Sequence, residues 1–100
     1  MRLNKVEISG VDTSRLTTLS EGEKKRLLEE IRSGNSDARN RMNLGNLRLV
    51  LSVVQRFTPK KDSLDDLFQV GCIGLIKAID NFDVNFDVKF STYAVPMIIG

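Results

Sequence analysis

The side chains best suited to chemistry in this chain are aromatic rings near its C-terminal end. Four of the six aromatic residues lie within twelve positions, next to Lys89 and two hydroxyl side chains: Phe82, Phe86, Phe90 and Tyr93. Aromatic rings beside a lysine and hydroxyls suit stacking on unpaired bases and binding of their phosphates. The same rings could instead fill the core beneath a loop, Phe82 above all, whereas the Tyr93 hydroxyl needs water or a polar partner. The cluster alone therefore leaves both interpretations open.

The acidic residues form no convincing catalytic or metal site. Asp65, Asp66, Asp80 and Asp83 have no spacing that builds one. The chain has no histidine and one cysteine, so the common zinc-ligand sets, histidine triads and internal disulfides are excluded. Cys72 lies in an apolar run and is expected to be a small core side chain. We expect no enzyme activity, no cofactor and no metal.

Length and composition describe one small domain. One hundred residues bury a single modest core, and 41% hydrophobic with 28% charged residues is ordinary for a globular protein. No apolar run approaches the roughly 18 residues that span a bilayer, and the first residues do not begin a signal peptide. These features predict a cytoplasmic protein without membrane attachment. A net charge of +2 is too small to indicate nucleic-acid binding by itself.

Hydrophobic periodicity and capping residues predict an all-α fold, a small helical bundle that follows an irregular N-terminal segment at 1–18. The composition of that segment fits either a short strand or a tail packed on the rest. Ser20 and Glu23 form the capping-box pattern, and Ser63 and Ser91 are expected to cap later helices. Pro96 is expected near the first turns of the last helix. The predicted helices are 20–33, 36–43, 46–57, 63–80 and 91–99.

Successive residues of a helix are about 100° apart around its axis, and this spacing gives the helix predicted at 63–80 two distinct faces. One side gathers an apolar stripe that we expect to face the core: Leu64, Leu67, Phe68, Gly71, Leu75, Ala78 and Ile79. The opposite side gathers a mixed stripe: Asp66, Gln69, Val70, Ile73 and Lys77. Such a stripe is typical of a partner surface, although another helix of the domain could equally cover Val70 and Ile73. Gly71 and Gly74 are expected to permit close helix packing, because each weakens an isolated helix by about 1 kcal/mol.

Several strings occur in an order that resembles the second domain of bacterial RNA polymerase sigma factors. They are NLRLVLS at 46–52, DLFQVG at 66–71, GL at 74–75 and KFSTYA at 89–94. Further strings are similar to the forespore sporulation branch of these factors, especially sigma-G: NKVEI at 4–8, GVDTS at 10–14 and VPMIIG at 95–100. The resemblance implies an extended segment at 1–18, short helices at 19–45, and a polymerase-docking and promoter-melting sigma domain at 46–100.

By this resemblance, the helix bearing Asp66 and Gln69 docks on the clamp coiled coil of the β′ subunit of core RNA polymerase. The mixed stripe described above is then the docking surface. Housekeeping members carry an acidic residue at the position of Val70 and an asparagine at that of Cys72. The resemblance also implies a role in transcription initiation during sporulation, in the forespore, with an anti-sigma factor as a further candidate partner.

The same resemblance implies contact with the melted single strand of promoter DNA. Segment 90–93 matches the part that captures a flipped adenine, on which Tyr93 would stack. Phe86 stands where an arginine is usual, and Pro96 and Met97 replace a tryptophan pair, so we expect weaker or differently tuned melting. The resemblance also implies a second pocket for a flipped base, lined by Asn46 and Leu49. The complete set of implied DNA-binding residues is Asn46, Leu49, Lys89, Phe90, Thr92 and Tyr93.

The chain ends at Gly100, where the family continues into a helix that reads the upstream edge of the promoter element. We therefore expect a fragment or truncated relative that does not direct transcription by itself. The alternative function is a protein-only module, bound by core polymerase or by an anti-sigma factor, with negligible DNA binding. Binding to the coiled coil but not to single-stranded DNA would favour that alternative.

Overall fold

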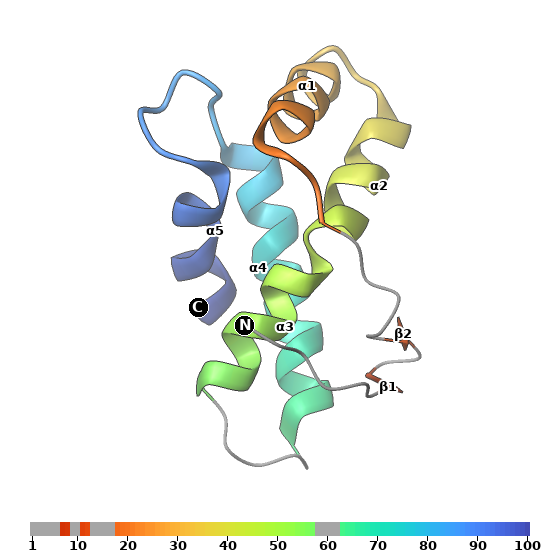
Figure 1. Cartoon of the computed structure of the whole chain (residues 1–100), viewed down its shortest axis with the longest axis vertical. Helices are drawn as coiled ribbons and strands as arrows, with labels where there is room; N and C mark the ends of the chain where they lie inside the picture. Colours follow the sequence, from red (N-terminus) through yellow and green to blue (C-terminus); the bar gives the residue numbers. More distant parts are fainter. Residues whose placement is uncertain (1–6, 9–10, 13–17, 58–62) are drawn as a thin grey trace.

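The computed structural model describes residues 7–8, 11–12, 18–57 and 63–100 (Figure 1). Strand β1 (Glu7–Ile8) pairs antiparallel with β2 (Val11–Asp12). The rest of the segment predicted to be irregular at 1–18 lies outside the described residues, Thr18 excepted. The helices are α1 (Glu21–Arg32), α2 (Ser36–Gly45), α3 (Leu47–Phe57), α4 (Leu64–Asn81) and α5 (Phe90–Ile99). The all-α prediction is confirmed, since the two strands span two residues each.

Helix α4 is the centre of the bundle. It packs against α5, α3 and α2, while α1 packs mainly on α2. In Figure 1, α1 and α2 lie at one end of the molecule, and the loop that joins α4 to α5 rises beside α1. The largest fully buried side chains come from four helices: Leu27, Met42, Leu51, Leu75, Ile79 and Val50. Among the residues that the structure describes, no helix combines the length and apolar character that a bilayer crossing requires.

The N-terminus of α1 has the predicted capping box. The Ser20 hydroxyl accepts a hydrogen bond from the Glu23 N–H at 3.2 Å, and the Glu23 carboxylate accepts one from the Ser20 N–H at 3.1 Å. These reciprocal bonds satisfy two N–H groups that the helix itself leaves open. Gly34, at φ +94°, then reverses the chain, and the Asn35 side chain caps α2 by accepting from the Ala38 N–H.

The predicted caps of α4 and α5 hold only in part. Ser63 is the N-cap residue of α4, as predicted, but its backbone is helical (φ −98°, ψ −3°) and its side chain makes no cap hydrogen bond, because a side-chain cap needs an extended residue. Helix α5 begins one residue earlier than predicted: Lys89 is the extended cap residue, and Ser91 lies inside the first turn. Pro96 also lies deeper in the helix than expected, at the seventh of ten positions.

The two glycines of α4 permit close packing, as predicted. A Cβ atom on Gly74 would lie 2.7 Å from the carbonyl carbon of Met97 and 2.9 Å from Cα of Ile98. A Cβ atom on Gly71 would lie 2.8 Å from the side chain of Val50 in α3. Helix α4 therefore contacts α5 and α3 at distances that a larger residue would prevent.

The core stripe of α4 is narrower than predicted. Phe68, Leu75 and Ile79 are buried, but Leu67 is 40% exposed, so its assignment to the core is wrong. Leu67 lies seven residues before Gly74, on the same face of the helix. Helix α5 covers this face at Gly74, through the backbone of Met97 and Ile98. The exposure of Leu67 shows that this cover does not continue two turns earlier.

Candidate functional site

The mixed stripe of α4 is open to solvent along its whole length. All five predicted members are exposed, with Val70 at 57% and Ile73 at 56%. The alternative that another helix of the domain covers these two side chains is therefore excluded for the described residues. Strand β1 also approaches α4. Two branched apolar side chains thus lie uncovered between the carboxylate of Asp66 and the ammonium group of Lys77.

The aromatic cluster centres on Phe82. Its ring makes edge-to-face contacts with Phe86, Phe90 and Tyr93, at centroid distances of 5.4, 5.4 and 5.3 Å. Phe82 is 4% exposed, which confirms the prediction that it belongs to the core. Phe86 is 45% exposed, and its ring lies 5.7 Å from that of the half-buried Tyr93. The cluster therefore extends from the core, where Phe82 is buried, to the surface, where Phe86 is exposed, and the ring of Tyr93 contacts both.

The predicted DNA-contacting residues of this segment differ in access. Lys89 and Thr92 are exposed and Tyr93 is half-buried, but Phe90 is only 2% exposed. Phe90 packs edge-to-face against Phe82, which leaves its ring no open face on which a base could stack. The ring of Phe82 in turn contacts Tyr93.

A hollow of about 370 Å³ brings the predicted second pocket together. This feature, which we call the α3 hollow, is lined by Thr18, Leu19, Lys24, Gly45, Asn46, Arg48, Leu49, Ser52 and Ser91. Asn46 is 2% exposed, and its amide nitrogen donates to the Met42 carbonyl at 2.7 Å, which fixes the side chain. The lining includes Lys24 and Arg48 but no carboxylate. The lining of the hollow therefore has a positive charge. It includes Ser91, which lies two residues before Tyr93 in α5.

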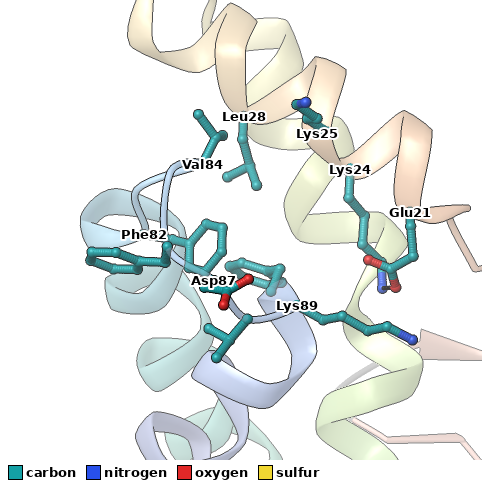
Figure 2. Close-up of a pocket in the computed structure, with 11 residues that line it drawn as sticks. Glu21, Lys24, Lys25, Leu28, Phe82, Val84, Asp87 and Lys89 are labelled. Carbon is teal, nitrogen blue, oxygen red and sulfur yellow. Dashed lines mark hydrogen bonds and ion pairs between the residues drawn. The ribbon is translucent and has the colours of Figure 1, made fainter.

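A second hollow lies between α1 and the loop before α5 (Figure 2). This feature, which we call the α1 groove, has a volume of about 410 Å³. Helix α1 contributes Glu21, Lys24, Lys25 and Leu28, and the other wall is Phe82, Val84, Phe86, Asp87, Val88, Lys89 and Phe90. Sequence reasoning missed the contribution of α1, because nothing in its pattern distinguishes these residues from an ordinary solvated face.

Two arginines attach α1 and α2 to the end of α4. The Arg39 guanidinium donates to both carboxylate oxygens of Asp80, at 3.0 and 2.8 Å. Arg32 donates to the backbone carbonyls of Asp80, at 3.1 Å, and of Phe82. The Arg32 bonds connect α1, and the Arg39 bonds connect α2, to the C-terminal end of α4.

Cys72 shows no sign of reactivity. Its side chain is half-buried, and burial raises the pKa of the thiol, so the thiolate is disfavoured at neutral pH. Within the described ranges, no three histidine, cysteine, aspartate or glutamate side chains come close enough to hold a metal ion.

The chain is similar to known sigma factors along its whole length. The sigma-70 region 2 family model matches residues 44–100. The chain is 64% identical over 100 residues to the RNA polymerase sigma-G factor of Clostridium acetobutylicum and 59% identical over 101 residues to that of Bacillus subtilis. It is 54% identical over 82 residues to the RNA polymerase sigma-F factor of Bacillus subtilis. The chain spans 39% of the length of each of these sigma-G factors and 32% of the sigma-F factor.

Proposed function

The chain belongs to the sigma-70 family through its region 2, and on this premise we propose that it acts in transcription initiation as a sporulation sigma factor. Its partners are core RNA polymerase and promoter DNA, its place is the cytoplasm of the forespore, and it catalyses no reaction. Residues 46–100 form the polymerase-docking and promoter-melting part, preceded by the short helices at 19–45 and the extended segment at 1–18. The observation that carries the proposal is the uncovered stripe on α4.

The stripe is the docking surface for the clamp coiled coil of the β′ subunit. Val70 and Ile73 each keep more than half of their surface in water. Complete burial of such a side chain stabilises by about 1.5–3 kcal/mol, so covering the exposed half of both contributes about 2 kcal/mol. Asp66 and Gln69 add polar contacts, and a hydrogen bond to a charged group contributes about 1.5–3 kcal/mol. This combination favours a polar, helical partner over a lipid surface or a small apolar ligand.

Binding to the isolated β′ coiled coil tests the docking surface. We expect Asp66→Ala to weaken binding by roughly 10- to 100-fold, and Gln69→Ala by less, because a neutral hydrogen bond contributes only about 0.5–1.5 kcal/mol. Glu29→Ala, an exposed carboxylate on α1, is the matched control and should bind like the parent. Circular dichroism should show an unchanged fold in all three. Parent-like binding by Asp66→Ala would contradict the docking surface.

We propose further that the face bearing Tyr93 and the α3 hollow holds the melted promoter strand. Tyr93 stacks on a flipped base, and Asn46 and Leu49 line the pocket for a second. Phe86 already contacts the Tyr93 ring, so an incoming base must displace it or share the ring with it. That competition supports melting that is weaker or differently tuned than in housekeeping factors. Phe90 is not a direct contact in this proposal.

Fluorescence anisotropy with single-stranded promoter DNA tests base capture. Tyr93→Ala should lose about 1–3 kcal/mol of stacking, or roughly 5- to 150-fold in affinity. Tyr93→Phe should retain most of it, since the ring is kept. A parent chain that binds the coiled coil but not the DNA would favour the protein-only alternative, in which core polymerase or an anti-sigma factor occupies the α4 stripe.

A further inference from the structure

The C-terminal end of α4 obtains its cation from another helix. The last turn of α4, which the structure describes in full, contains no basic residue. Arg32, the final residue of α1, donates to the backbone carbonyl of Asp80 at 3.1 Å and to that of Phe82. A cation near the last carbonyls of a helix is favourable, because these groups lack partners within the helix and carry partial negative charge. Helix α1 therefore supplies a charge that the sequence of α4 does not.

The carbonyl of Phe82 is the point at which this cation reaches the aromatic cluster. Phe82 is the C-cap residue of α4, and its backbone is extended (φ −71°, ψ 131°). Its N–H donates to the Ala78 carbonyl at 2.9 Å, whereas its own carbonyl accepts from Arg32. The backbone of Phe82 is thus held by α4 on one side and by α1 on the other. A planar guanidinium that bridges two carbonyls restricts the backbone between them more than a single bond does.

The surroundings of Tyr93 depend on the position of Phe82. The buried ring of Phe82 makes edge contacts with the rings of Phe90 and Tyr93, at centroid distances of 5.4 and 5.3 Å. Because closely packed side chains transmit small displacements, a shift of the Phe82 backbone moves the surface against which Tyr93 lies. Helix α1 packs mainly on α2, so the Arg32 bonds connect the cluster to a different part of the bundle.

We propose that Arg32 is a positioning residue for base capture. Its bond to the Phe82 carbonyl fixes the ring against which Tyr93 is oriented, and in this role it contacts neither a base nor a phosphate. The inference rests on the proposed stacking of a flipped base on Tyr93. Arg39 provides the contrast, because the bonds described for its guanidinium reach the Asp80 carboxylate and no carbonyl of the aromatic loop. A difference between the two arginines therefore reports the Phe82 contact, not the attachment of helices in general.

Two measurements compare Arg32→Gln with its matched control, Arg39→Gln, which makes the same charge change and also removes bonds to the end of α4. The chain has one tyrosine and no tryptophan, so near-ultraviolet dichroism of the folded chain reports the surroundings of Tyr93. Arg32→Gln should change that signal, and Arg39→Gln should not. In anisotropy with single-stranded promoter DNA, Arg32→Gln should bind about 3- to 10-fold more weakly, the loss typical of a partly exposed hydrogen bond. Arg39→Gln should bind like the parent.

Salt dependence and a double-mutant cycle distinguish positioning from direct contact with DNA. A residue that neutralises a phosphate contributes about 0.7 to the slope of log K against log salt, whereas Arg32→Gln should leave that slope unchanged. Tyr93→Ala removes the ring that Arg32 positions, so Arg32→Gln should weaken binding by less than about twofold in that background. A parent-like tyrosine signal in Arg32→Gln, a reduced salt slope, or full additivity with Tyr93→Ala would overturn the proposal.

The outcomes separate this inference from base capture itself. If Tyr93→Ala weakens DNA binding while Arg32→Gln behaves like Arg39→Gln, positioning by Arg32 is wrong and base capture stands. If Tyr93→Ala binds like the parent, or if the parent binds no single-stranded DNA, base capture is wrong and the role of Arg32 is wrong with it. Arg32→Gln should bind the β′ coiled coil like the parent, because the bonds described for Arg32 reach no residue of the α4 stripe. An equal loss there would indicate general damage to α4 and would contradict positioning.

Discussion

Substitution of Gly74 by alanine tests whether contact between α4 and α5 sets the position of the Tyr93 segment. An added Cβ atom would lie 2.7 Å from the Met97 carbonyl carbon and 2.9 Å from the Ile98 Cα, where ordinary contact begins at 3.4 Å. Both neighbours are backbone atoms, so no side-chain rotation can relieve the overlap. Helix α5 must therefore move away from α4 by at least about 0.7 Å, and the aromatic cluster must move with it.

The size of the effect follows from two opposed contributions. Alanine is favoured over glycine inside a helix by about 1 kcal/mol. Overpacking a well-packed contact costs typically 1–3 kcal/mol, and a clash with backbone belongs at or above the upper end. We expect Gly74→Ala to lower the free energy of unfolding by about 2 kcal/mol. Gly22→Ala is the matched control: nothing lies within 4 Å of its Cβ position, so it should stabilise by up to about 1 kcal/mol.

Urea unfolding followed by circular dichroism measures both variants. In thermal unfolding of a domain of this size, a loss of 2 kcal/mol corresponds to a fall in Tm of about 8–16 °C. Tyr93 is the single tyrosine and the chain has no tryptophan, so near-ultraviolet dichroism and fluorescence report on α5 directly. Gly74→Ala should change that signal in the folded state, and Gly22→Ala should not. If Gly74→Ala is as stable as Gly22→Ala and leaves the tyrosine signal unchanged, the close contact does not position α5.

Three further effects test other parts of the fold. Leu75→Ala, at a fully buried site, should destabilise by about 2–5 kcal/mol, whereas Leu67→Ala should cost less than about 1 kcal/mol because that side chain is 40% exposed. Ser20→Ala removes the cap of α1 and should cost about 0.5–2 kcal/mol in urea unfolding. Hydrogen bonds from Ser20, above all from its backbone N–H, lower the pKa of Glu23, so the stabilisation that the Glu23 carboxylate contributes is complete at neutral pH and is lost as the pH falls through the acidic range of this group; Glu23→Ala should therefore cost less stability in unfolding at low pH than at neutral pH. Burial raises the pKa of the Cys72 thiol, so alkylation at neutral pH should be slow in the folded chain and should accelerate on unfolding; equal rates would contradict its burial.

Features that depend on residues close together in the chain were predictable. The capping box at Ser20 involves groups three residues apart, and its bonds form as the pattern indicates. The mixed stripe of α4 follows from helical periodicity, and its five members are all exposed. Periodicity could not, however, distinguish a solvent-exposed stripe from one covered by another helix. The exposure of Val70 and Ile73 excludes that cover within the described residues, whereas their role in docking stays a prediction.

Features that depend on where a neighbouring element begins or ends were predicted poorly. Leu67 belongs to the apolar side of α4 by angle, but α5 covers that side only farther along the helix. Phe90 is of a residue type that can stack on bases, yet its ring packs against Phe82 in the core.

The sequence by itself determined the helical class, the α1 cap, the outward stripe of α4 and the resemblance to the sigma family, because each is encoded by residue identities at short, regular spacing. Only the tertiary structure decided which aromatic rings remain accessible, which apolar residues lack cover, and that α1 forms one wall of a cationic groove. These properties arise from contacts between different elements, such as Gly74 of α4 with Met97 of α5 and Arg32 of α1 with Phe82. Such contacts depend on how whole helices pack, and the spacing of residues within any one helix does not specify them.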